Sequence, residues 1–378
     1  MTLPVVTLPV VAAILPPRER FAPDSAGAIG LLVHRLAGIR TAFDTRVIGT
    51  SQPETFPGIP FRAAPMPLLR MHPLRRYEAG VARLLRAAPP ALIEVHNRPD
   101  MALYLADRFP GIPVCLFLHN DPRGMRHART PAERATLLSR LARVVTVSDF
   151  LRGLLLEGVT AQATPPAVLP NNLDLRAIPA APEPREQTIL FAGRVVADKG
   201  ADLFVGACAR ALPALPGWRA EMIGADRFGP DTPETPFLRA IRPRAAAAGV
   251  AMAGYRPHDA VLAAMARAAI VAVPSRWPEP FGLTALEAMA TGAALITAPN
   301  GALPEVVGEA ALVTDPADIP AFAAAIRALA GDAARRRALG EAGRARARLF
   351  DLPVAAGALD ALRRDVLRAW SRKPGRPI

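Results

Sequence analysis

Short, almost wholly apolar runs alternate with segments of helical periodicity along most of this chain. In the first half the runs are Val10–Leu15, Ala91–Asn97, Val114–Asn120 and Val144–Ser148. Continuous apolar runs are typical of parallel strands buried on both faces, and the helical segments between them supply the crossovers that parallel strands require. The pattern therefore predicts an α/β fold with doubly wound parallel sheets.

The alternation occurs twice. A segment rich in proline and asparagine, Leu169–Arg185, interrupts it, and a second series of strands and helices follows. We expect two Rossmann-like domains, residues 1–172 and residues 173–350, that face each other across a cleft. A final helical segment follows at residues 351–378. The strands expected in the second series are Thr188–Ala192, Arg219–Ile223, Val250–Ala253, Ile270–Pro274, Ala294–Thr297 and Ala311–Thr314.

The composition is that of a globular protein, with 51% hydrophobic and 21% charged residues among 378. The net charge is +13, and only two of the 46 basic residues, Lys199 and Lys373, are lysines. A lysine in so arginine-rich a sequence is therefore a small functional signal. The excess of positive charge fits either a solvated surface or an anionic partner such as a phosphorylated glycolipid or a membrane surface, and we expect no nucleic-acid partner.

Two features predict a cytoplasmic protein. Cys115 and Cys208 lie in an apolar strand and a helical segment, which is typical of free thiols in a reducing compartment. The apolar start, residues 1–15, contains prolines, lacks a basic segment and is too short to span a bilayer. We interpret it as containing the first strand rather than a signal peptide.

Several polar residues follow strands of the first half, where ligands of doubly wound sheets bind. His96, His119 and Ser148 stand at such ends, and we rank His119 first because an arginine-rich loop follows it. A small-residue turn at Ser25–Gly27 would let backbone approach a ligand, or is simply a tight turn. The segment Met66–Ala88 has one apolar and one arginine-rich face, which fits a packed helix with a solvated side or a contact with anionic headgroups.

The segment Ser275–Gly292 carries two carboxylates, Glu279 in a proline-punctuated loop and Glu287 on the helix that follows. If the helix begins near Phe281, Glu287 lies roughly 9 Å along its axis, at 1.5 Å per residue. The backbone N–H groups of Phe281, Gly282 and Leu283 at the helix start would then lie between the carboxylates and suit a diphosphate. This spacing fits a nucleotide-sugar, with one acid at the sugar and the other at the ribose.

Two cations follow the first strand of the second half. Arg194 stands at the end of that strand, and Lys199 lies five residues later, near the start of a helix. Fixed positive groups stabilise the charge that develops on a departing diphosphate. The alternative, that Lys199 is only a surface residue beside Asp198, is weaker in a chain with so few lysines.

Some common catalytic motifs are absent from the sequence. It contains no DxD motif, clustered Cys/His ligands, phosphate-binding P-loop, GxSxG motif or dinucleotide-binding glycine fingerprint. These absences argue against a metal-dependent transferase, a P-loop enzyme, an esterase and a NAD-dependent dehydrogenase.

Three motifs, GRVVADKG (Gly193–Gly200), PSRWPEPFGLTALEAMATG (Pro274–Gly292) and NGALPEVV (Asn300–Val307), resemble in order and spacing those of glycosyltransferase family four. This family comprises the group 1 retaining transferases of the GT-B fold. The resemblance spans about Leu169–Phe350, and the first half matches more loosely. It implies that the C-terminal helix crosses back to the first domain.

The resemblance also implies residue roles. Glu279 would contact hydroxyls of the donor sugar and Glu287 the ribose, while Arg194 and Lys199 would hold the diphosphate. The family retains anomeric configuration, most plausibly by front-face attack, and needs no metal or other cofactor.

In the first domain, Gly27 would approach the diphosphate and His119 would lie beside the transferred sugar. The family usually has paired glycines where this chain has Ala26-Gly27. We expect the base and sugar to be selected near Tyr255 and Arg256.

The leading hypothesis is a metal-independent, retaining hexosyltransferase that uses a nucleotide-diphosphate sugar, with UDP-sugars expected first. Its acceptor would be an anionic glycan or glycolipid in lipopolysaccharide or exopolysaccharide synthesis, reached by peripheral association with the cytoplasmic face of the inner membrane. The alternatives are a GT-B nucleotide-sugar epimerase and a non-catalytic partner subunit that binds nucleotide-sugars.

Overall fold

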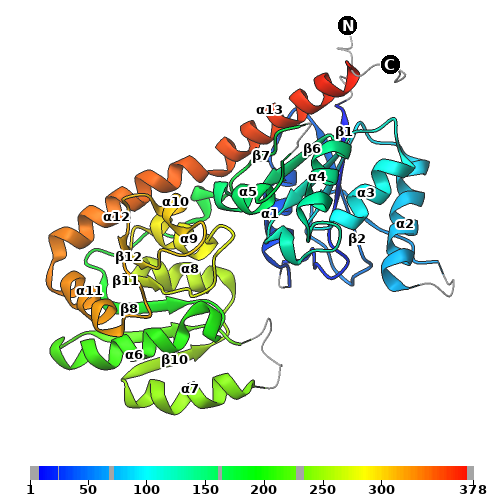
Figure 1. The fold of residues 1–378 in the computed structure, drawn as a ribbon. Helices are drawn as coiled ribbons and strands as arrows, with labels where there is room; N and C mark the ends of the chain where they lie inside the picture. Colours follow the sequence, from blue (N-terminus) through cyan, green and yellow to red (C-terminus); the bar gives the residue numbers. More distant parts are fainter. Residues whose placement is uncertain (1–7, 24, 68–71, 161–163, 227–233, 373–378) are drawn as a thin grey trace, which may run out of the picture. The chain divides into compact units, whose positions relative to one another are not determined.

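The computed structural model describes residues 8–23, 25–67, 72–160, 164–226 and 234–372. The chain divides into two compact units, one formed by Met1–Asn172 with Leu352–Ile378 and the other by Leu173–Asp351. Each unit contains one sheet whose neighbouring strands are all parallel, with helices packed on it (Figure 1). The predicted fold class, two doubly wound α/β units, is confirmed.

The first sheet has the strand order β3-β2-β1-β4-β5-β6-β7. Its central pair is in register with Val11 opposite Leu92 and Ile14 opposite Val95, so two buried apolar runs lie side by side. The strands are β1 (Val10–Ile14), β2 (Asp44–Gly49), β3 (Phe61–Ala63), β4 (Leu92–His96), β5 (Val114–Leu118), β6 (Arg143–Thr146) and β7 (Ala167–Val168).

Helices cover both faces of this sheet. Side chains of α2, α3, α4 and α5 pack in one core cluster with residues of β1, β4 and β5, and those of α1 and α13 pack in separate clusters. The helices are α1 (Ala28–Gly38), α2 (Pro73–Ala87), α3 (Pro99–Arg108), α4 (Pro131–Arg140), α5 (Asp149–Leu156) and α13 (Leu352–Ser371).

The second sheet repeats the topology with the order β10-β9-β8-β11-β12-β13. Its strands are β8 (Glu186–Ala192), β9 (Arg219–Ile223), β10 (Val250–Gly254), β11 (Ala268–Val273), β12 (Ala294–Thr297) and β13 (Leu312–Val313). Its helices are α6 (Ala201–Ala211), α7 (Pro236–Ala247), α8 (His258–Arg267), α9 (Leu283–Thr291), α10 (Leu303–Val307), α11 (Ile319–Gly331) and α12 (Ala333–Ala347).

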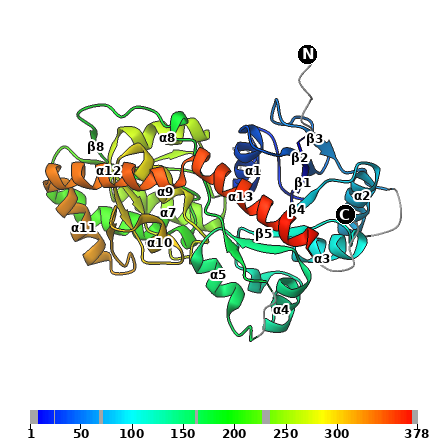
Figure 2. The same ribbon diagram turned by 90° about the horizontal axis from the view of Figure 1, so that it is seen from above.

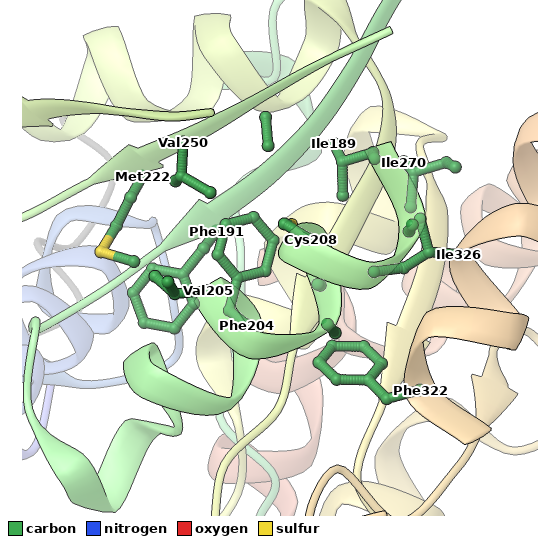
Figure 3. Packing of buried hydrophobic residues seen from close by; sticks show 14 of the residues in the cluster. Ile189, Phe191, Phe204, Val205, Cys208, Met222, Val250, Ile270, Phe322 and Ile326 are labelled. Atoms are coloured by element: carbon green, nitrogen blue, oxygen red, sulfur yellow. The ribbon is translucent and has the colours of Figure 1, made fainter. Parts of the chain in front are cut away.

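The core of the second unit lies between this sheet and helices α6, α7 and α11. Figure 3 shows Phe191 of β8 beside Phe204 of α6, with ring centroids 5.6 Å apart, and Phe322 of α11 nearby. Burial of such aromatic side chains contributes a large share of folding free energy. The core therefore fixes β8, whose carboxyl end carries Arg194.

The C-terminal helix α13 belongs to the first unit, as the resemblance implied. Leu359 and Val366 pack against Val11, Leu92 and their neighbours, and the helix runs along this unit (Figure 2). At the same interface Arg363 forms a bidentate ion pair with Glu94 of β4, with both N–O distances 2.8 Å and both side chains buried. A chain end is thus joined to the central strand by a buried charge pair.

The structure adds elements that the sequence reading missed. The sequence predicts no strand at β2 or β3, and Leu303–Val307, within the third motif, forms the short helix α10. Within the predicted segment Met66–Ala88, helix α2 begins at Pro73, and residues 68–71 lie outside the described part of the chain. Among the helices described, none is long and apolar enough to cross a bilayer.

Candidate active site

The topology of each sheet marks a place for a ligand. In both units the strand order reverses beside the first strand, between β1 and β4 and between β8 and β11. Ligands of doubly wound sheets bind beyond the carboxyl ends of strands at such switch points. In the second unit Gly193 and Arg194 follow β8, and the loop from Ser275 to Glu279 follows β11.

Lys199 and Glu279 meet at this edge. Lys199 ends the 3₁₀ turn η3 (Ala197–Lys199), and its Nζ lies 2.5 Å from Oε1 of Glu279. The hydroxyl of Ser275 donates to the same carboxylate oxygen at 2.7 Å. Glu279 is only 7% exposed, so its charge is held by a cation and a hydroxyl rather than by solvent.

The loop that carries Glu279 is fixed to η3 by its backbone. The carbonyl of Asp198 accepts hydrogen bonds from the N–H groups of Arg276 and Trp277 at 2.9 and 3.0 Å. Asn300 donates from Nδ2 to the carbonyl of Ser275 at 2.8 Å. These contacts position Glu279 and Lys199 relative to each other before any ligand binds.

Gly301 packs directly on the backbone of Glu279. Its φ is +65°, a left-handed conformation that L side chains rarely adopt, and a Cβ there would lie 2.3 Å from the nitrogen of Glu279. The next N–H, that of Ala302, donates to the carbonyl of Glu279 at 2.8 Å. Only glycine therefore fits between the two segments.

Helix α9 begins at Leu283, two residues later than the sequence suggested. Gly282 is its N-cap and has φ +97°, which keeps Phe281 and Gly282 out of the helix. Glu287 therefore lies roughly 6 Å along the axis from the first helical residue, not 9 Å. Phe281 is buried and packs edge-on against Phe350, so only its backbone is available for a ligand.

Arg194, Tyr255, Arg256 and Glu287 line one pocket of about 200 Å³. Its remaining walls are the glycine turns after β8 and β9, residues of α8, and Thr284 at the start of α9. Lys199 and Glu279 are not among its lining residues. The structure thus divides the predicted residues of this unit into a group that lines the pocket and the separate Lys199–Glu279 pair.

The sequence reading missed His258, the first residue of α8. Its Nε2 lies 2.7 Å from Oε1 of Glu287. The histidine stands close in sequence to Tyr255 and Arg256, but no local signal pairs it with a glutamate 29 residues away.

In the first unit His119 follows β5 and is paired with His96 at the end of β4. Nδ1 of His96 lies 3.0 Å from Nε2 of His119, and the backbone N–H of His119 donates to Oδ1 of Asn97 at 3.0 Å. Among the described residues, the buried Nδ1 of His119 has no hydrogen-bond partner. Burial lowers the pKa of His96 to about 3, helped by the charge of Arg363, and burial together with His96 lowers the pKa of His119 well below its usual value. Both imidazoles are therefore neutral at physiological pH.

Gly27 is the N-cap of α1, but a carboxylate of the chain already lies there. Oε1 of Glu19 accepts a hydrogen bond from the N–H of Gly30 at 2.8 Å, and a Cβ on Gly27 would lie 2.7 Å from that oxygen. Burial raises the pKa of Glu19, and the N–H groups of Gly30 and Gly27 oppose this. A diphosphate at Gly27 would have to displace this carboxylate.

The arginine-rich face of α2 is partly occupied. Arg75 pairs with Glu78 at 2.9 Å, and Arg76 donates to the carbonyl of Pro67 at 2.6 Å, whereas Arg83 and Arg86 are exposed.

The described ranges contain no group of three or more His, Cys, Asp or Glu side chains that could hold a metal ion.

Two family models match the chain. Glycosyl transferases group 1 matches residues 176–346, and Glycosyltransferase Family 4 matches residues 35–177. Together they extend over both units.

The curated relatives of this chain include glycosyltransferases. The D-inositol 3-phosphate glycosyltransferase of Segniliparus rotundus is 35% identical over 52% of this chain and 44% of its own length. The lipopolysaccharide core biosynthesis mannosyltransferase LpsB of Rhizobium meliloti is 31% identical over 49% of this chain and 54% of its own. The chain thus spans about half the length of each of these relatives.

Among solved structures, Anabaena HepE in complex with UDP has a TM-score of 0.77 to this chain. The match covers 95% of this chain and 100% of HepE, with 18% sequence identity. This similarity is one of fold.

Proposed function

The chain belongs to the group 1 glycosyltransferases of family four, and it has their GT-B fold. From this premise we propose that it is a retaining glycosyltransferase that moves a hexose from a nucleotide-diphosphate sugar to a glycan or glycolipid acceptor. The observation that carries the proposal is the arrangement at the carboxyl edge of the second sheet. There Arg194 and Glu287 line one pocket, and Lys199 and Glu279 form an ion pair in the loops that follow β8 and β11.

We assign the nucleotide to the pocket of the second unit. Glu287 accepts hydrogen bonds from the ribose hydroxyls, Arg194 binds the diphosphate, and Tyr255 with Arg256 contacts the base. The N–H groups at Phe281, Gly282 and Leu283, where α9 begins, contribute a partial positive charge near the phosphates. UDP is our first choice of nucleotide because HepE, which shares the fold, was solved with UDP.

We assign the binding of the sugar and of its leaving group to the Lys199–Glu279 pair. Glu279 orients the sugar through its hydroxyls, and Lys199, with Arg194, stabilises the negative charge that grows on the β-phosphate as the glycosidic bond breaks. The acceptor oxygen attacks the anomeric carbon on the face from which the diphosphate departs, so the configuration is retained. The departing diphosphate takes the acceptor proton. These fixed cations do the electrostatic work, so we propose that no metal is required.

The first unit supplies the acceptor side. We propose that His119, neutral and with its Nδ1 available, contacts the transferred sugar, and that Gly27 approaches the diphosphate once Glu19 moves aside. An envelope acceptor is supported by the similarity to LpsB, a mannosyltransferase of lipopolysaccharide core biosynthesis. The exposed Arg83 and Arg86 would favour an anionic acceptor at the cytoplasmic face of a membrane.

The test is release of nucleoside diphosphate from UDP-, GDP- and ADP-sugars, with and without EDTA, by the wild type and by Glu287→Ala. We expect release from one donor, insensitive to EDTA and weakened in the variant through a higher KM. Loss of release in EDTA would contradict the metal-free mechanism. An inverted sugar formed without acceptor would instead indicate an epimerase, and nucleotide binding without any turnover, even with acceptor lipids and glycans added, would indicate a binding subunit.

A further inference from the structure

The hydrogen bond between His258 and Glu287 is set by the packing of two helices. His258 begins α8 and Glu287 lies in α9, and the two helices are in contact. Nε2 of His258 donates to Oε1 of Glu287 at 2.7 Å. The glutamate side chain is 11% exposed and the histidine side chain 41%, so the carboxylate is enclosed and its partner reaches solvent.

Arg185 joins the same two helices at their C-terminal ends. The guanidinium of Arg185 donates from NH1 to the carbonyl of Ala266, near the end of α8, at 2.6 Å, and from NH2 to the carbonyl of Thr291, the last residue of α9, at 2.5 Å. Cations near helix C-termini are stabilised by the helix dipoles. Arg185 therefore links the C-terminal ends of α8 and α9, which helps to hold His258 opposite Glu287.

This arrangement assigns different tasks to the two oxygens of Glu287. Oε1 is engaged by His258, and Glu287 lines the nucleotide pocket, where Oε2 has no hydrogen-bond partner among the described residues. An unrestrained glutamate loses rotamer freedom when it binds a ligand. A glutamate already held through one oxygen has lost that freedom in advance.

We infer that His258 is a positioning residue of the nucleotide site, which holds Glu287 in the orientation that receives the 2′- and 3′-hydroxyls of a nucleoside diphosphate. The inference rests on the proposed function in one respect, the ribose role of Glu287. It adds a residue outside the family motifs, whose effect should be confined to ligands that carry the ribose hydroxyls.

The test measures binding rather than turnover. UDP is titrated into the full-length protein by calorimetry, with GDP and ADP in parallel, for the wild type, His258→Leu, His258→Gln and Asp259→Asn. We expect His258→Leu to raise the Kd of the bound nucleotide about tenfold, the range expected when an ordered side chain is released. The amide of His258→Gln can still donate to Glu287 and should restore most of the affinity. Asp259→Asn, at the neighbouring exposed position, should bind like the wild type.

Two further arms exclude a merely structural effect. In the Glu287→Ala background, adding His258→Leu should cause no further loss, because the residue it positions is gone. The 2′,3′-dideoxy form of the bound nucleotide, which lacks both hydroxyls, should bind more weakly than the parent to the wild type and be nearly insensitive to His258→Leu. An equal loss for both nucleotides, or an undiminished loss in the Glu287→Ala background, overturns the inference.

The ribose role of Glu287 and the positioning role of His258 can be disproved separately. If Glu287→Ala leaves nucleotide affinity unchanged, the ribose role in the proposed function is wrong, and the role of His258 is wrong with it. If Glu287→Ala weakens binding and His258→Leu does not, only the inference is wrong. Melting temperatures of all variants show that each protein is folded.

Discussion

Lys199 is the residue on which the proposed chemistry most depends. Its ammonium lies 2.5 Å from Glu279 and is partly exposed, so it remains within reach of a ligand. An ammonium carries three donors, and the bond to Glu279 uses one of them. Lys199 is therefore able to orient Glu279 and bind a phosphate oxygen at the same time.

We predict that Lys199→Ala lowers kcat by two to three orders of magnitude, because one charge-stabilising donor is typically worth roughly 3–4 kcal/mol in such sites. The chain's other lysine provides the control, and Lys373→Ala should leave kcat unchanged. Initial rates at saturating donor would measure both. Near-normal turnover of the Lys199 variant would remove this residue from the mechanism.

The paired histidines predict how stability depends on pH. His96 binds a proton in the folded state only near its lowered pKa of about 3, whereas in the unfolded chain it does so near 6.5. The unfolded state therefore binds more protons between these values, and the free energy of unfolding falls as pH decreases from 6.5, by about 1.4 kcal/mol per pH unit for each such histidine. Above pH 6.5 this contribution is constant.

Replacing His96 by Phe removes its share of this acid sensitivity. Urea unfolding of the wild type and His96→Phe at pH 7.5 and pH 5.0 should show a smaller loss of stability on acidification in the variant. The contribution of carboxylates is common to both proteins. An equal loss in both would show that His96 is protonated in the folded state at pH 5.0.

At the scale of elements, the local sequence pattern predicted most of the strands but not the contacts between distant segments. The bounds of β9 and β12 were predicted to the residue. β12 is buried throughout and apolar except for its last residue, as is typical of parallel strands, whereas β9 carries Arg219 and Glu221. β2 begins with Asp44-Thr45-Arg46, and β3 has three residues with Arg62 at its centre, so neither forms a continuous apolar run. The start of α9 was misplaced because Gly282 is left-handed, and a sequence read with helical periodicity does not show φ.

The candidate site was predicted in the same uneven way. The residues within motifs, Arg194 and Glu287, do line one pocket, and Lys199 and Glu279 are in contact. Ser275 and Asn300 lie within the motifs, but nothing in the sequence pairs them with the loop of Glu279, and His258 lies outside the motifs. They are selected by the tertiary approach of separate loops, which periodicity and spacing do not encode.

The glycine between two loops gives a prediction at this scale. Gly301→Ala places a methyl group on the backbone of Glu279 and forces a left-handed residue to be alanine, so the loop from Ser275 to Glu279 must shift. Such strain costs of order 1–3 kcal/mol, and we expect a lower kcat together with a lower melting temperature. Gly331→Ala, where an added Cβ meets no atom within 4 Å, is the matched control. Wild-type kinetics for Gly301→Ala would show that this contact does not position Glu279.

At the scale of the whole molecule, the buried pair of Arg363 and Glu94 ties the last helix to the first unit. Removing one partner leaves the other charged and buried, so Arg363→Met should destabilise the first unit by roughly 3–5 kcal/mol. Arg363→Met combined with Glu94→Leu should recover most of that loss, since replacement of a buried ion pair by apolar side chains is often neutral. Urea unfolding followed by the fluorescence of Trp370, which lies on α13, would measure this in a variant whose other tryptophans are replaced.

If Arg363→Met is as unstable as predicted and the double variant with Glu94→Leu is equally unstable, this view of the pair is wrong. That result would mean that Arg363 contributes through another contact, such as the one from its NH1 to the hydroxyl of Thr45 at 3.2 Å.

The place of α13 also has a consequence for how the protein is made. A ribosome releases β1 to β7 long before it releases α13, so until α13 has emerged Arg363 cannot pair with Glu94, and Val11 and Leu92 lack the side chains of α13 that cover them. The second unit, whose segments are continuous in the chain, emerges whole and in order. The first unit is therefore completed only after the second unit has emerged, and until then the nascent chain exposes an apolar face that chaperones would recognise.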